Sequence, residues 1–152
     1  MSFGYGVSDF ITVATIAWKI SLVLRSTKEA SESYNNLIQE LESTAQSLYQ
    51  TGKLLETAGL PASTANCISH GLSRCHSNLL RLRVIVKEYQ KSFEIPTMAQ
   101  VKQKNWHNMW RMKVQLKKIS WAMCEKESVN KIRQNIKRGV TEIALILDAC
   151  GL

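Results

Sequence analysis

The stretch ISHGLSRCHSNLLRLRVIVKEY, residues 68–89, decides the fold class of this chain. Its apolar residues recur at alternating spacings of four and three, which places them on one side of an α-helix. The row consists of Ile68, Leu72, Cys75, Leu79, Leu82, Val86 and Tyr89. Basic residues fall mostly outside this row. Such a regular alternation is typical of a helix that packs at a shallow angle against a neighbouring helix.

Similar apolar rows lie on both sides of this stretch. Residues 30–55 and 129–147 repeat apolar side chains every three or four positions, and residues 98–120 carry a broader, aromatic face. There is no sustained alternation of period two and no Asn-Gly or Asp-Gly hairpin signal. The predicted fold class is therefore all-α: an antiparallel four-helix-type bundle with a short additional N-terminal helix, about five helices in all.

The expected boundaries follow from capping residues. A single domain is expected over residues 1–152, with a first helix over about 9–25 and the bundle over about 27–149. Ser8 or Asp9 is a candidate N-cap of the first helix. The second helix is expected to end near Ala58, with Gly59 as its C-cap and Pro61 soon after. Ser63 or Thr64 is then expected to open the third helix, and residues 92–97 to form a loop.

The first helix contains an apolar run over residues 10–24, interrupted by Lys19 and a few small polar residues. The run is about fifteen residues long, whereas a membrane-spanning helix needs roughly 20. A buried core helix is the first interpretation, and a segment that inserts into a membrane is the alternative.

Charge is distributed unevenly along the chain. Residues 1–60 carry four basic and six acidic side chains, and residues 61–152 carry sixteen basic and six acidic ones. No acidic residue lies between Glu94 and Glu125, where three tryptophans alternate with basic residues. The basic residues of that stretch are Lys102, Lys104, Arg111, Lys113, Lys117 and Lys118. They predict either a solvated helix face or a contact with a partner or an anionic lipid surface; no nucleic-acid-binding motif accompanies them, so nucleic acid is not an expected partner.

The sequence offers little for catalysis or metal binding. Cys67 and Cys75 lie about 12 Å apart along one predicted helix, so with His70 and His76 they cannot close around one ion, and no C-x-x-C pair is present. There is no G-x-S-x-G elbow and no phosphate-binding loop. We therefore expect no catalytic residues, no metal and no cofactor. The opening residues also lack the features of a secretory signal, so a cytoplasmic protein with reduced cysteines is expected.

Two stretches resemble a known family. The opening MSFGYGVSDFI resembles the start of many filamentous-fungal proteins of the STAND (NLR-like) class, and LKKISWAMCEKE, residues 116–127, resembles their K-K-x-x-W-A signature, here carried by Lys118, Trp121 and Ala122. The same arrangement is found in fungal HeLo and HeLo-like domains, and the resemblance covers nearly the whole chain.

The resemblance implies an N-terminal signalling domain that self-associates and takes part in cell death or heterokaryon incompatibility. In the HeLo group the apolar first helix is released on oligomerisation and targets the membrane. For this chain the resemblance implies that the membrane-targeting residues are Phe10, Ile11, Val13, Ile16, Ile20, Val23 and Leu24. The implied partners are further copies of the chain, a signalling protein and anionic membrane lipids, with recruitment from the cytoplasm to the plasma membrane on activation. The alternative is an adaptor bundle that docks a partner protein and does not disrupt membranes.

Overall fold

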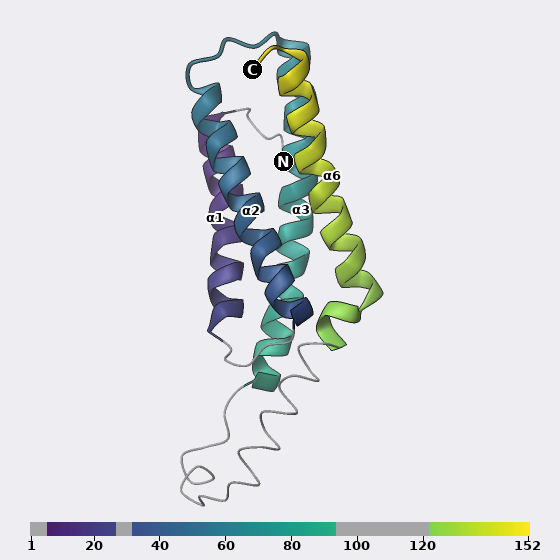
Figure 1. Cartoon of the computed structure of the whole chain (residues 1–152). Coiled ribbons are helices and arrows are strands. Elements are labelled where there is room, and N and C mark those ends of the chain that lie inside the picture. The colour runs from purple at the N-terminus through teal and green to yellow at the C-terminus, as the bar shows by residue number, and fades with distance from the viewer. Residues whose placement is uncertain (1–5, 27–31, 94–121) are drawn as a thin grey trace, which may run out of the picture.

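The computed structural model describes residues 6–26, 32–93 and 122–152 (Figure 1). Four long helices account for most of this described part: α1 (Val7–Arg25), α2 (Glu32–Leu55), α3 (Ala62–Phe93) and α6 (Glu127–Ala149). Residues 122–125 add a helical turn before α6, and no strand occurs among the described residues. The all-α bundle is confirmed, and α1, with 19 residues, is the shortest of the four long helices in the described part.

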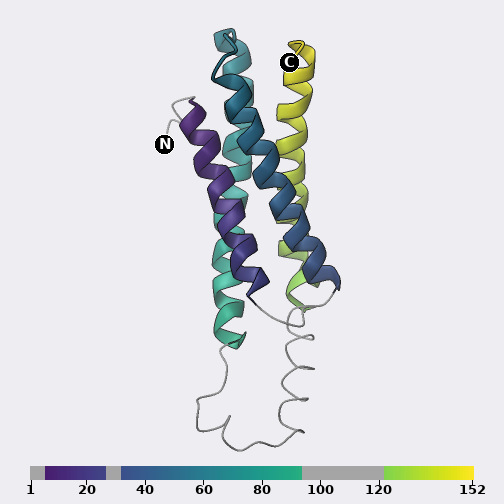
Figure 2. The ribbon, with the colours of Figure 1, turned by 60° about the vertical axis from the view of Figure 1, so that its left-hand side comes forward.

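The helices alternate in direction and form two pairs. Figures 1 and 2 show α1 running from one end of the bundle to the other, α2 returning, α3 running parallel to α1, and α6 returning again. α1 packs most extensively on α2, and α3 on α6, whereas contacts between α1 and α3 and between α2 and α6 are sparser. α2 and α3 are consecutive in the chain but lie diagonally across the bundle without close backbone contact.

The predicted apolar rows form the core. In α3, Ile68, Leu72, Cys75, Leu79, Leu82 and Val86 are all buried, and Tyr89 is half-buried against them. In α6, Val129, Ile132, Ile136, Ile143 and Leu147 are buried, with Val140 half-buried beside them. The three-and-four spacing therefore identified the inward faces of both helices.

Glycines allow close helix contact within each pair. A Cβ atom at Gly139 of α6 would lie 2.6 Å from Cys75 Sγ and 2.9 Å from the Gly71 carbonyl oxygen of α3. A Cβ atom at Gly52 of α2 would lie 2.9 Å from the Cβ atom of Phe10 in α1. Since real Cβ atoms do not approach other atoms this closely, both crossings depend on the missing side chain.

Several helix ends differ from the predicted ones. Gly6, not Ser8 or Asp9, is the N-cap of α1; Asp9 instead accepts a hydrogen bond from the Gly6 N–H (3.1 Å). α2 ends at Leu55, before the expected Ala58. α3 begins directly after Pro61, whose carbonyl accepts a hydrogen bond from the N–H of residue 65 (3.0 Å). Proline fixes its own φ near the helical value, which favours the start of a helix at this point.

The C-terminal end of α3 lies beyond the predicted one, and the C-terminal end of α6 is closed by a glycine motif. α3 continues to Phe93, into the segment 92–97 that was expected to be a loop. α6 runs from Glu127 to Ala149 with Cys150 as its C-cap, and Gly151 follows with a φ of 76°. The Leu152 N–H donates to the Leu147 carbonyl and the Gly151 N–H to the Asp148 carbonyl, both at 3.0 Å. This is a Schellman motif, which requires the left-handed backbone that glycine adopts readily.

Candidate functional site

The first helix combines the composition of a membrane segment with a position in the core. α1 has 19 residues and a mean hydropathy of 1.6, enough by length and composition to cross a membrane. Of the apolar stretch of α1 that meets this criterion, only 39% is buried in the bundle. A core helix of a water-soluble bundle meets the same criterion, so the surroundings of each side chain decide what the helix can do.

Four of the seven predicted membrane-targeting residues are buried within the bundle. Phe10, Val13, Ile20 and Leu24 have at most 2% of their surface exposed. Ile11, Ile16 and Val23 are half-buried and line a groove between α1 and α3. In the packed bundle these seven side chains therefore belong to the core or to its edge, and contact with lipid would require α1 to move.

Two apolar residues of α1 that the prediction omitted are exposed instead. Trp18 is 48% exposed and Leu22 is 47% exposed. Trp18 lines a shallow hollow of about 470 Å³ together with Tyr49 of α2. Trp18 and Leu22 are four residues apart and so share one face of α1. That spacing was visible in the sequence, but only the packing reveals that this face points away from the core.

The groove between α1 and α3 has an apolar floor and basic edges. Its volume is about 460 Å³, which falls within the usual range for small-molecule sites. The apolar part of the lining comes mainly from Ile11, Ile16, Ile20, Val23 and Val86. Among the described residues, the charged ones that line it are Lys19 of α1 and Arg83 and Lys87 of α3.

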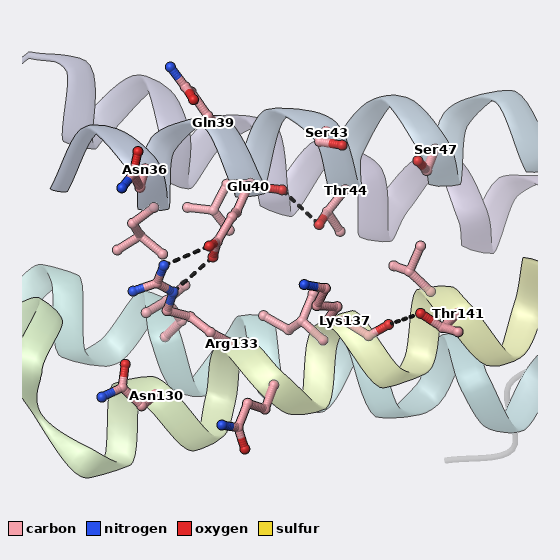
Figure 3. Close-up of a pocket in the computed structure, with 16 residues that line it drawn as sticks. Asn36, Gln39, Glu40, Ser43, Thr44, Ser47, Asn130, Arg133, Lys137 and Thr141 are labelled. Carbon is pink, nitrogen blue, oxygen red and sulfur yellow. Dashed lines mark hydrogen bonds and ion pairs between the residues drawn. The ribbon is translucent and has the colours of Figure 1, made fainter. Parts of the chain in front are cut away.

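A larger groove of about 880 Å³ lies between α2 and α6 (Figure 3). Its walls are mostly polar, and Leu37, Leu41, Leu82 and Ile136 are the buried residues that line it. The polar residues labelled in Figure 3 are Asn36, Gln39, Glu40, Ser43, Thr44, Ser47, Asn130, Arg133, Lys137 and Thr141. The Thr44 and Thr141 hydroxyls donate to carbonyls of their own helices, both at 2.8 Å, so they are already engaged.

One ion pair crosses the α2–α6 groove. Arg133 Nε lies 2.8 Å from Glu40 Oε2, and Arg133 Nη2 lies 2.6 Å from Glu40 Oε1. The hydrogen bonds that Arg133 donates to Glu40 raise the pKa of the Arg133 guanidinium, so the pair stays ionised. The arrangement is a bidentate bridge between the helices and places no nucleophile beside a base.

The described cysteines do not form a reactive site. Burial raises the pKa of the Cys75 thiol to about 12 and that of Cys124 to about 11. Both thiols are therefore neutral near pH 7 and act as small apolar side chains. Cys67 and Cys150 are exposed. Among the described residues, no group of three or more His, Cys, Asp or Glu side chains could hold a metal ion.

The predicted basic surface cannot be placed. Lys102, Lys104, Arg111, Lys113, Lys117 and Lys118 lie outside the described residues, as does Trp121 of the family signature. Ala122 of that signature is described, and it is exposed at the start of the helical turn over residues 122–125. Comparisons with protein-family models, with curated proteins and with solved structures find no match to this chain.

Proposed function

We propose that the chain is a helical signalling domain of the fungal NLR-like or HeLo-like type, which self-associates and targets α1 to a membrane in a cell-death or incompatibility response. The observation that carries the proposal is the double character of α1. Its length and hydropathy suit a membrane, yet Phe10, Val13, Ile20 and Leu24 are packed inside a water-compatible bundle. The resemblance in residues 1–11 and 116–127 supports the same function.

The mechanism we propose is a two-state packing of α1. Exposing a large apolar side chain to water costs about 1.5–3 kcal/mol, so releasing Phe10, Val13, Ile20 and Leu24 into solvent is strongly unfavourable. Release becomes feasible when the bilayer, or a neighbouring copy of the chain, buries the same surface again. Exposed Trp18 and Leu22 give α1 an apolar face that can meet the membrane before the core opens.

The second candidate is an adaptor that docks a partner protein without touching lipid. The α2–α6 groove of about 880 Å³ favours it, because its lining includes buried Leu37, Leu41, Leu82 and Ile136, and the apolar face of an additional amphipathic helix can pack on such residues. In this alternative α1 remains a core helix throughout.

The experiment that separates the two is dye leakage from liposomes, with and without anionic lipid, using Trp18→Asp and Leu22→Asp variants. Both positions are about half exposed, so the bundle should keep its helix content and melting temperature. An aspartate at the centre of a membrane helix costs about 2.5–3.5 kcal/mol, so leakage should fall at least about tenfold. Leu145→Asp on α6, 62% exposed, is the matched control and should leak like the unmodified chain.

The opposite result is equally clear. Intact liposomes at every concentration of the folded, unmodified chain would reject membrane targeting and leave the adaptor function. Equal losses in Leu22→Asp and Leu145→Asp would show that added negative charge, not the face of α1, controls leakage.

A further inference from the structure

We infer that the groove between α1 and α3 is a binding site for a free single-chain amphiphile with an anionic head, such as a long-chain fatty acid, and that this ligand holds α1 in the packed state. The binding claim rests on the groove itself, and its consequence for α1 rests on the proposed function.

The first step is charge. Every charged residue that lines the groove in the described part of the chain is basic: Lys19, Arg83 and Lys87. Elsewhere in the described part of the chain, Arg25, Arg74 and Arg133 pair with carboxylates of a neighbouring helix. Lys19, Arg83 and Lys87 form no ion pair with a described residue. Three positive charges drawn from two helices, without an acid among the lining residues, complement an anionic head group.

The second step is shape. Below these charges the groove offers Ile16, Ile20, Val23 and Val86 as an apolar surface. Along α1 the lining runs from Ile11 to Val23, a distance of about 18 Å at the helical rise. A groove of about 460 Å³ whose lining is largely apolar fits one acyl chain, whose methylene groups each gain free energy on leaving water. A hydrophilic anion such as phosphate would leave the floor unused.

The third step is linkage. The charged residues belong to both helices, and so does the apolar floor. A ligand that needs both helices binds only when α1 is packed against α3, so it stabilises that state and raises its melting temperature. The groove would thus oppose the release of α1, and loss of the ligand would favour it.

The test is thermal unfolding of the full chain with sodium dodecanoate kept below its micelle-forming concentration. Dodecyl maltoside, with the same chain and a neutral head, is the ligand control. The site variant is Lys19→Gln, Arg83→Gln and Lys87→Gln combined. The matched variant combines Arg81→Gln, Lys137→Gln and Arg138→Gln, which removes the same charge from exposed positions outside the groove.

Dodecanoate should raise the melting temperature of the unmodified chain and of the matched variant, and the site variant should bind it at least about tenfold more weakly. Dodecyl maltoside should have little effect. Equal weakening in both variants, an equal shift with dodecyl maltoside, or a shift with anionic liposomes but none with dodecanoate would overturn the inference.

The two proposals fail separately. Leakage that depends on Leu22, without any effect of dodecanoate, would remove only the groove ligand. A melting-temperature rise that depends on the three basic residues would support the groove site even if the chain never causes leakage.

Discussion

Helix α6 has two contacts of different kinds. Its backbone approaches that of α3 closely, whereas an open groove lies between it and α2. At the α3 contact, Gly71 and Gly139 bring the helices together, and the Asn135 amide donates to the Asn78 side-chain oxygen (3.3 Å). At the α2 contact, space of about 880 Å³ remains and the Glu40–Arg133 pair crosses it. The bundle therefore consists of two tightly packed pairs, α1–α2 and α3–α6. Two looser contacts, α1–α3 and α2–α6, join the pairs, and we call these contacts the seams.

This difference bears on the release of α1 that we propose. α1 packs far more extensively on α2 than on α3. Peeling α1 away by itself breaks the tighter contact, whereas separating the α1–α2 pair from the α3–α6 pair breaks only the two seams. The grooves of about 880 Å³ and 460 Å³ lie at these two seams, whereas the shallow hollow of about 470 Å³ beside Trp18 lies on the tighter α1–α2 contact. A ligand or partner that binds in a groove therefore acts on the weaker contacts of the fold.

The largest expected effect comes from breaking the close contact. Gly139→Val places a side chain where a Cβ atom alone would lie 2.6 Å from Cys75 Sγ and 2.9 Å from a backbone carbonyl. Overpacking of this kind costs about 1–3 kcal/mol, and we expect the upper end because the backbone cannot yield easily. Urea unfolding measures the loss. The control is Gly59→Val, where nothing lies within 4 Å of the added Cβ and the change should be small.

A loss for Gly139→Val no larger than that for Gly59→Val would contradict the comparison, since the α3–α6 contact would then have room to adjust. The seams would no longer be the looser part of the bundle.

The sequence predicted the inward faces of α3 and α6 but not the helices that they pack against. Residues such as Leu72 and Leu79 were assigned to the core because their spacing alone places them on one face of α3. Periodicity carries no information on which neighbour receives that face. The diagonal placement of α2 and α3, and the pairing of Glu40 with a residue 93 positions away, could only be learned from the structure.

The candidate site was predicted less completely. The apolar run of α1 was found, but the exposure of Trp18 and Leu22 depends on where α2 and α3 pack. The basic edge of the α1–α3 groove was also missed, because Lys19 and Arg83 are far apart in the sequence and meet only in the bundle. In the sequence alone, Lys19 is simply an interruption of the apolar run.

A smaller effect should appear as a dependence of stability on pH at the close contact. Cys75 lies there, and its Sγ donates to the Ile136 carbonyl (3.6 Å). Burial raises the pKa of this thiol from its ordinary value of 9.0 to about 12. Above pH 9 the unfolded thiol loses its proton while the folded one keeps it, so stability is full below about pH 9 and is lost as the pH rises towards 12.

We expect the unfolding free energy to fall by about 1 kcal/mol between about pH 8 and pH 10 through this thiol. Cys75→Ala should flatten that slope, whatever its effect on absolute stability, whereas Cys67→Ala should not, because Cys67 is exposed. Urea unfolding at several pH values measures both slopes. Identical slopes in the two variants would mean that Cys75 is not held in a water-free contact.

The smallest expected effect concerns the ion pair in the open seam. Surface pairs typically contribute about 0.2–1 kcal/mol. Glu40–Arg133 should lie near the top of that range, because Arg133 makes two hydrogen bonds and its side chain is only 21% exposed. Arg74–Glu142 joins α3 to α6 at 2.7 Å with side chains 42% and 45% exposed, and should contribute less.

Double-mutant cycles with Glu40→Gln and Arg133→Met, and with Glu142→Gln and Arg74→Met, measure both couplings. Added salt should weaken each of them. A larger coupling for Arg74–Glu142 would mean that charge supports the tight contact more than the open one, and that the α2–α6 seam is held by the packing of its floor.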